Sequence, residues 1–238
     1  MAKKIIVILG GSGEIGSSIA LNLKNEYKPF LIARNEDRLK EVSKKIHCDY
    51  AVSDINDKNS YIETLKKIKD PIYGFAYCVG SISLKSIKNS TKNDFLDSFN
   101  INVLGAITGI QTVLEQLVNN KGSILLFSTI AVKNGFSNHS IIASSKGAIE
   151  GLTRSLAAEL SPEVRVNCIA PSLVESKMSN KIISNSKIAE GIAKMHPIPK
   201  LGKGKDFGAL GALLLTDISS WITGQIYNVD GGRSSLNK

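Results

Sequence analysis

Residues 4–16 read KIIVILGGSGEIG, and this stretch decides the fold. Residues 5–9 form a continuous apolar run rich in β-branched side chains, which is typical of a strand buried on both faces. Four of the next seven residues are glycine, and an amphipathic segment follows. Such a loop lets the backbone turn tightly and lets a phosphate group approach the N-terminus of the next helix. The stretch therefore predicts a strand, a phosphate-binding loop and a helix.

Short apolar runs alternate with amphipathic stretches along the rest of the chain. The apolar runs predict strands at 4–9, 29–33, 50–52, 72–79, 122–128, 165–170 and 222–229. The amphipathic stretches predict helices at 15–25, 37–46, 58–68, 91–118, 140–160 and 205–215. This alternation requires a parallel sheet with helices on both faces. We therefore predict an α/β fold with a doubly wound sheet of about seven strands.

The chain shows no sign of division into parts. It has no internal repeat and no Pro/Gly-rich linker, so we expect a single domain over residues 1–238. Residues 172–200 are expected to be irregular or to form only short helices. Active-site lids are among the few reasons for so long a stretch of this kind, so we predict that it covers the substrate.

Composition excludes several classes of function. Hydrophobic residues make up 42% and charged residues 21% of the 238 residues, as in globular proteins, so disorder is excluded. The net charge is +9, but lysines supply most of it among acidic neighbours, and only five arginines and 6% aromatics occur. We therefore expect no nucleic-acid partner, and an anionic small ligand explains the charge better.

Three cysteines without paired spacing argue against a disulfide framework and against a metal site. The N-terminus lacks a signal-peptide cleavage site, and no run reaches the ~18 apolar residues of a membrane span. We therefore expect a cytoplasmic protein with no membrane partner.

The end of the second predicted strand indicates which dinucleotide would bind. An acidic residue here selects NAD, because it bonds the ribose 2′-hydroxyl. This chain has Ala33 at that point, followed by Arg34, whose guanidinium can pair with a 2′-phosphate. The sequence therefore predicts a preference for NADP(H) over NAD(H). Asp54, after the third strand, is placed either to accept a hydrogen bond from an adenine amino group or to cap the next helix.

Taken together, the motifs resemble those of the short-chain dehydrogenase/reductase family, over essentially the whole chain. The glycine loop at 10–16, Asp54-Ile55, Asn102, the helix that carries Lys146, and the stretches 165–171, 222–225 and 229–232 resemble family motifs in the family's order. The resemblance implies a Rossmann-type domain that binds a nicotinamide dinucleotide. The implied cofactor-binding residues are Gly10, Ser12, Gly13, Glu14, Ile15, Gly16, Arg34, Asp54, Ile55, Val79, Gly80, Lys146, Pro171 and Ser172.

The chain departs from the family at the active site. Common members carry a tyrosine four residues before the lysine, and its phenol exchanges a proton with the substrate oxygen. Ile142 stands at that position, and no tyrosine occurs between Tyr77 and Tyr227. The family's serine corresponds to Thr129, which keeps a hydroxyl. The resemblance therefore implies Asn102, Thr129 and Lys146 as candidate catalytic residues, without the phenol.

Two interpretations of this departure stay open. In the first, His139 supplies the proton, because it lies seven residues before Lys146, a spacing similar to the tyrosine of the enoyl-reductase branch. Alternatively, His139 is a solvated residue at the start of a helix and has no catalytic role. In the second interpretation the chain binds NADP(H) but has lost the chemistry, and acts as a sensor or partner subunit.

Each candidate residue also has a structural interpretation. Asn102 could bridge buried backbone groups, Thr129 could be an ordinary hydroxyl at a strand end, and His196 is primarily a loop residue. We nevertheless expect an NADP(H)-dependent oxidoreductase that acts on a small carbonyl, alcohol or enoyl substrate. The helices at 91–118 and 140–160 resemble those that pack family members into oligomers, so we expect a homodimer or homotetramer.

Overall fold

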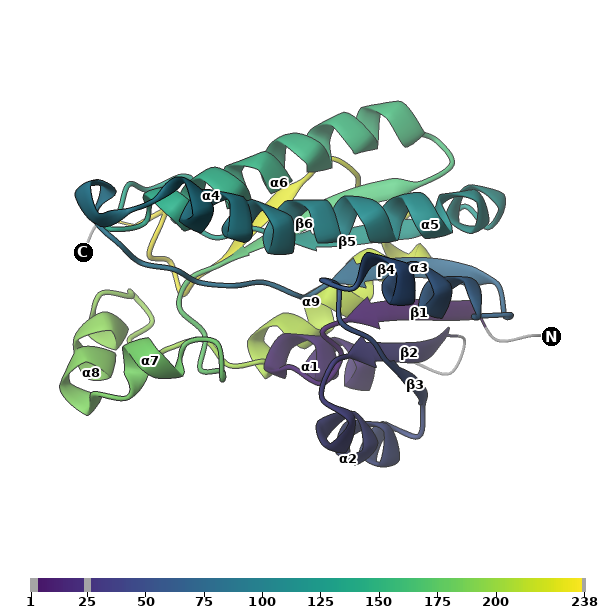
Figure 1. The fold of residues 1–238 in the computed structure, drawn as a ribbon, viewed down its shortest axis with the longest axis horizontal. Coiled ribbons are helices and arrows are strands. Elements are labelled where there is room, and N and C mark those ends of the chain that lie inside the picture. Colours follow the sequence, from purple (N-terminus) through teal and green to yellow (C-terminus); the bar gives the residue numbers. More distant parts are fainter. Residues whose placement is uncertain (1–3, 24–26, 237–238) are drawn as a thin grey trace.

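A computed structural model describes residues 4–23 and 27–236. Seven parallel strands form one sheet in the order β3-β2-β1-β4-β5-β6-β7, with helices on both faces (Figure 1). The strands are β1 (Lys4–Leu9), β2 (Tyr27–Ala33), β3 (Asp49–Val52), β4 (Ile72–Tyr77), β5 (Ser123–Phe127), β6 (Arg165–Pro171) and β7 (Ile226–Val229). The strand order reverses between β1 and β4, where sheets of this kind bind their ligands. The predicted doubly wound α/β fold is confirmed.

Nine α-helices connect the strands or follow them in the described part of the chain. They are α1 (Glu14–Asn22), α2 (Glu36–Ile46), α3 (Lys58–Lys66), α4 (Lys92–Phe99), α5 (Gly105–Asn119), α6 (Ser140–Leu160), α7 (Asn180–Ile183), α8 (Ser186–Lys194) and α9 (Lys205–Leu215). Residues 24 and 25 of the first predicted helix lie outside the described residues.

Strand β1 shows why its sequence is continuously apolar. Alternate side chains point to opposite faces of a strand. Ile5 and Val7 belong to the core layer that includes α3, α5 and α6. Ile6 and Ile8 belong to the opposite layer, with α1, α2 and α9. Both faces of β1 are therefore buried, and its carboxyl end is held rigidly under the glycine loop.

The last strand is shorter than predicted. We expected it from residue 222, but it begins at Ile226. The preceding residues bond to β6 through side chains as well as backbone, since Thr223 Oγ1 accepts from the Val166 amide at 3.0 Å and the Gly224 amide donates to the carbonyl oxygen of Val166 at 2.7 Å. Asn167 Oδ1 likewise accepts from the amide of Gln225 at 3.1 Å. The β-branched pair Ile222 and Thr223 favours a strand, but Gly224 has φ +71° and interrupts the extended backbone.

The helix predicted at 91–118 is interrupted by a π-helical turn at Asn100–Leu104. The amide of Gly105 donates to the carbonyl oxygen of Asn100, five residues earlier, and the turn widens there. The hydroxyl of Tyr77, at the end of β4, donates to the carbonyl oxygen of Ile101 at 2.6 Å. A side chain at Gly105 would overlap the Tyr77 hydroxyl, so glycine is required at this point.

The α4–α5 helix is long and apolar enough to cross a membrane by length and composition alone. It runs from Lys92 to Asn119 and has a window of mean hydropathy 1.3, of which 44% is buried within this fold. Core helices of folded domains pass the same test, and this helix packs on β4, α3 and α6.

The segment between β6 and α9 contains only two short helices, as predicted. Helices α7 and α8 lie beyond the sheet, on the side where β6 ends (Figure 1). Val174 forms an isolated bridge with Gly202, which ties the two ends of the segment together.

Candidate active site

The predicted site residues gather at the carboxyl edge of the sheet. The loops after β1, β2, β3 and β4 carry the glycine motif, Arg34, Asp54 and Gly80. Thr129 follows β5, and Ser172 follows β6. Parallel strands end at the same edge, so six segments distant in sequence meet there.

The glycine loop is closely packed against its neighbours. Gly10 has φ +74°, and a Cβ there would lie 2.8 Å from the carbonyl oxygen of Cys78. A Cβ at Gly16 would lie 2.6 Å from the carbonyl oxygen of Gly10. Gly13 caps α1 without a side-chain hydrogen bond, so the first amides of the helix are left for an anion. The loop therefore fits a pyrophosphate group.

Arg34 and Asp54 lie together at the ends of β2 and β3. A guanidinium nitrogen of Arg34 is 3.8 Å from an Asp54 carboxylate oxygen, and the arginine side chain is 77% exposed. The other Asp54 oxygen accepts from the amide of Asn56, so Asp54 holds a turn. The helix after it is capped by Asp57, so Asp54 does not have the capping role we considered.

Ser53 adds a signal that the sequence did not offer. Its hydroxyl oxygen is the one buried side-chain N or O atom without a hydrogen-bond partner in the described part of the chain. Ser53 directly follows β3 and precedes Asp54. Buried hydroxyls are rarely left unpaired, so a ligand that supplies a polar atom here would satisfy it. The position fits the adenosine half of a dinucleotide.

Lys146 is buried on α6 and points to the sheet edge. Its Nζ atom donates to the carbonyl oxygen of Phe127, the last residue of β5, at 2.8 Å. A Cβ at Gly80 would lie 3.6 Å from the same Nζ atom. Burial lowers the pKa of Lys146 to about 8, because the interior disfavours its charged form. Lys146 is therefore not an exposed helix lysine, and it can exchange a proton near neutral pH.

The Asn102 side chain is occupied by structural hydrogen bonds. Its Nδ2 atom donates to the carbonyl oxygen of Ser98 at 2.9 Å and to the Ser81 hydroxyl at 3.2 Å. Its Oδ1 atom accepts from the amide of Ser81 at 3.3 Å. The residue ties the loop after β4 to the π-helical turn. The amide thus bridges buried backbone groups directly, and its contribution is to position the loop that carries Gly80.

The hydroxyl of Thr129 lies between β5 and β6. It donates to the carbonyl oxygen of Pro171 at 3.4 Å and accepts from the amide of Ala131 at 3.3 Å. Both contacts are long, so the hydroxyl can be redirected to a ligand at little cost. The neighbouring Ser128 donates to Glu150 at 2.8 Å and faces α6 instead.

The ring of His139 makes its contacts within the loop before α6. Its ring stacks edge-on against Phe136, with 5.4 Å between centroids, and its Nδ1 donates to the carbonyl oxygen of Ser137 at 2.7 Å. Within the described residues, no hydrogen bond joins His139 to Lys146 or Thr129. Ile142 is buried, one helical turn before Lys146. The resulting picture favours a structural role for His139 at the start of α6.

His196 lies in the loop after α8, as expected, and it is buried there, with 4% exposure. Its Nδ1 donates to the carbonyl oxygen of Ile192 at 2.8 Å. Its Nε2 is therefore the accepting nitrogen, and it takes the hydroxyl hydrogen of Ser172 at 2.8 Å. The pair fixes the end of α8 to the end of β6.

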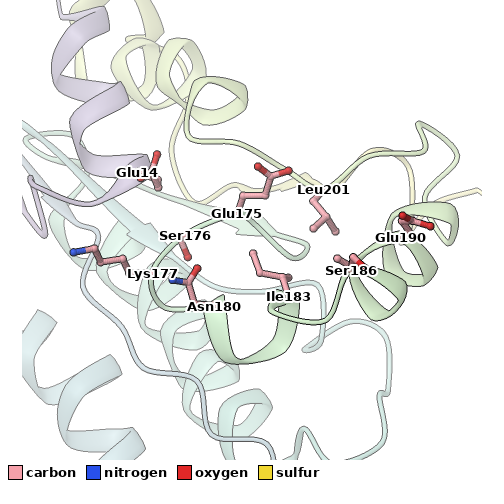
Figure 2. Close-up of a pocket in the computed structure, with 10 residues that line it drawn as sticks. Glu14, Glu175, Ser176, Lys177, Asn180, Ile183, Ser186, Glu190 and Leu201 are labelled. Atoms are coloured by element: carbon pink, nitrogen blue, oxygen red, sulfur yellow. The ribbon is translucent and has the colours of Figure 1, made fainter.

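A cavity of about 630 Å³ lies between the start of α1 and the segment that contains α7 and α8. Glu14, Glu175, Ser176 and Lys177 line it, with Ile183 and Leu201 on the apolar side (Figure 2). The size suits part of a ligand that passes the glycine loop. Glu14 is exposed and borders this cavity.

The comparisons with known proteins agree with this architecture. A family model described as enoyl-(acyl carrier protein) reductase matches residues 12–234. The chain is 28% identical to carbonyl reductase family member 4 of Xenopus laevis, over 96% of this chain and 97% of that protein. It is 31% identical to L-xylulose reductase of Caenorhabditis elegans, over 98% of this chain and 96% of that protein.

The solved structure of Cj0485 dehydrogenase superposes with a TM-score of 0.91, at 27% identity, over 99% of this chain and 96% of that chain. The chain belongs to the short-chain dehydrogenase/reductase family, a family of oxidoreductases.

Sequence reasoning missed the polar cluster behind Lys146. The hydroxyls of Ser98 on α4 and Ser145 on α6 lie 2.9 Å apart, and both residues are buried. Ser98 also accepts from Asn102, four residues later. The available signal was a serine and an asparagine at helical spacing on an otherwise apolar face.

Proposed function

We propose that the protein transfers a hydride between NADP(H) and a carbonyl or alcohol carbon, with the reacting proton held at Lys146 Nζ. One observation carries this proposal: a buried ammonium group with a pKa of about 8 stands at the carboxyl edge of the sheet, beside Gly80. A catalytic acid works best when its pKa lies near the working pH.

The residues at the sheet edge fit the cofactor. The glycine loop and the uncapped start of α1 would hold the pyrophosphate, and Ser53 would meet the adenosine. Arg34 would pair with the 2′-phosphate, while Asp54 keeps the guanidinium in place. When bound, the cofactor supplies or accepts the hydride.

In this proposal Lys146 exchanges the proton that the tyrosine phenol exchanges in common family members. In reduction, its ammonium gives a proton to the substrate oxygen, and the neutral amine regains one from solvent. The Thr129 hydroxyl, which has only long hydrogen bonds, turns toward the same oxygen and polarises the carbonyl. A lysine with a pKa near 8 is still largely protonated at pH 7, so the acid form is available.

A second candidate function follows from Ile142. The side chain at the tyrosine position is a buried hydrocarbon that has no proton to give. A chain that kept its cofactor site but lost its chemistry would act as an NADP(H)-binding sensor or partner subunit.

Turnover assays separate these two functions. NADPH oxidation is measured with ketones, aldehydes and enoyl thioesters, and NADPH affinity is measured separately by calorimetry. We expect turnover in the wild type, a loss of at least 100-fold in kcat for Lys146→Met, and near-normal kcat for His139→Phe. Tight NADPH binding without turnover of any substrate would favour the sensor. If His139→Phe lost kcat and Lys146→Met retained it, the proton donor would be His139 instead of Lys146.

A further inference from the structure

Arg233, just after β7, joins three segments near the site. Its guanidinium carbon lies 4.7 Å from the centroid of the Phe136 ring, in the loop after β5. Its Nη1 lies 3.5 Å from the Ser172 hydroxyl at the end of β6, and its Nη2 lies 3.4 Å from Met195 Sδ after α8. The guanidinium is therefore held by three contacts, one with an aromatic ring and two that are weak hydrogen bonds.

No carboxylate of the described residues forms a direct ion pair with this guanidinium, although Asp230 is near enough to attract it electrostatically. Within residues 4–23 and 27–236, no acidic oxygen lies within 4.0 Å of it. The nearby Asp230 is occupied, because its two oxygens accept from the amides of Gly232 and Ser234. Arg165, which is also partly buried, instead bonds backbone carbonyls of Leu214 and Thr216 at 3.0 Å.

Arg233 is connected to the candidate catalytic residue Thr129 through Ser172 and Pro171. Ser172 follows Pro171, whose carbonyl oxygen accepts from Thr129, and Ser172 also contacts Arg233. The Ser172 hydroxyl gives its hydrogen to His196, so its lone pairs remain directed elsewhere. The Ser172 contact therefore places Arg233 beside the residue that follows β6, the strand whose last carbonyl oxygen accepts from the Thr129 hydroxyl.

We propose that Arg233 binds a carboxylate on the substrate, which makes the substrates oxo acids and the corresponding hydroxy acids. This rests on the hydride transfer proposed above. A planar guanidinium matches a carboxylate bidentately, and Arg233 holds its guanidinium between Phe136 and Met195. Burial also lowers the pKa of Arg233, which is the effect expected where an ion has lost water and gains by meeting a counter-charge.

Matched acids and esters test this proposal. Linear oxo acids from pyruvate to 5-oxohexanoate are compared with their methyl esters in NADPH-dependent reduction. The wild type should prefer an acid over its ester by at least tenfold in kcat/KM, mainly through KM. Arg233→Gln should lose 10- to 100-fold on the acid and little on the ester, and Arg233→Lys should retain part of the preference. Arg38→Gln removes an equal charge from α2 and serves as the control.

Equal kcat/KM for acid and ester in the wild type, or an equal loss on both in Arg233→Gln, would overturn the proposal. A binding measurement keeps it separate from the proposed hydride transfer. Saturation-transfer NMR on the NADPH-loaded protein compares hexanoate with hexanamide. Binding of hexanoate alone, lost in Arg233→Gln, supports the carboxylate site even if nothing is turned over. Equal binding of both compounds refutes the site.

Discussion

The Nζ atom of Lys146 lies 2.8 Å from the carbonyl oxygen of Phe127, in a buried position. No carboxylate lies within 4.0 Å of it among the residues that the structure describes. A buried ammonium that has one neutral partner is destabilising, and its pKa falls to about 8 for this reason. The same arrangement would make a proton available near neutral pH, which is the role that we propose for Lys146.

Replacing this lysine with an apolar residue is expected to stabilise the cofactor-free protein. Its pKa falls from 10.5 in the unfolded chain to about 8 in the fold. The unfolded state therefore binds more protons between these values, and wild-type stability rises with pH across that window. Below pH 8, Lys146→Met should raise the free energy of unfolding by about 1–3 kcal/mol.

Urea denaturation at several pH values measures this effect. The advantage of Lys146→Met should shrink as the pH rises from about 8 to 10.5. An advantage that is constant with pH would show that packing, rather than the buried charge, causes it.

Arg34 should determine the cofactor preference. The wild type is expected to bind NADPH more tightly than NADH, and Arg34→Ala should weaken NADPH by about 10- to 100-fold with little effect on NADH. Calorimetry measures both. Lys40→Ala, which removes a paired charge from α2, is the matched control. Equal affinity of the wild type for the two cofactors would refute the preference.

The substitution Ile142→Tyr should restore a phenol as a proton donor beside Lys146. Ile142 lies four residues before Lys146 on α6 and is buried, so Ile142→Tyr should cost about 1–3 kcal/mol in overpacking. It should also raise carbonyl reduction by at least tenfold, since the phenol adds a second proton donor and the neighbouring ammonium lowers its pKa from the ordinary value of about 10. Ile142→Phe has the same bulk without the hydroxyl, and an equal gain in that variant would remove the chemical explanation.

The protein is expected to be a homodimer or homotetramer. Leu96, Phe99 and Leu104 are each between 39% and 48% exposed along the α4–α5 helix, a surface that a second copy would cover. Light scattering should give a multiple of 25.6 kDa, and Phe99→Glu should shift it toward the monomer. A wild-type particle of 25.6 kDa at micromolar concentration would contradict this expectation.

Much of the fold was predictable because it depends on local pattern. Buried parallel strands are continuously apolar, so β1 and β6 were located from sequence nearly to the residue. The glycine loop was predictable because only glycine fits its close approaches. The place of Arg34 at the sheet edge was predictable because the residue directly follows β2.

The rest of the site depends on contacts between distant residues. Tyr77 reaches a carbonyl 24 residues later, and this contact helps to hold the π-helical turn that no periodicity indicates. Arg233 contacts Ser172 across 61 residues, so nothing near Arg233 in the sequence indicates the substrate contact that we propose for it. The pKa of Lys146 likewise depends on burial by the whole fold.

The pH dependence of kcat/KM for NADPH-dependent reduction tests the proton assignment most directly. The rate should be constant below about pH 8 and fall tenfold per pH unit above it, because reduction needs the Lys146 ammonium. The reverse oxidation should rise to a plateau above the same pH, since it needs the neutral amine. His139→Phe should leave the midpoint near 8. A rate that is unchanged through pH 8, or a midpoint near 6.5 that disappears in His139→Phe, would contradict the assignment to Lys146.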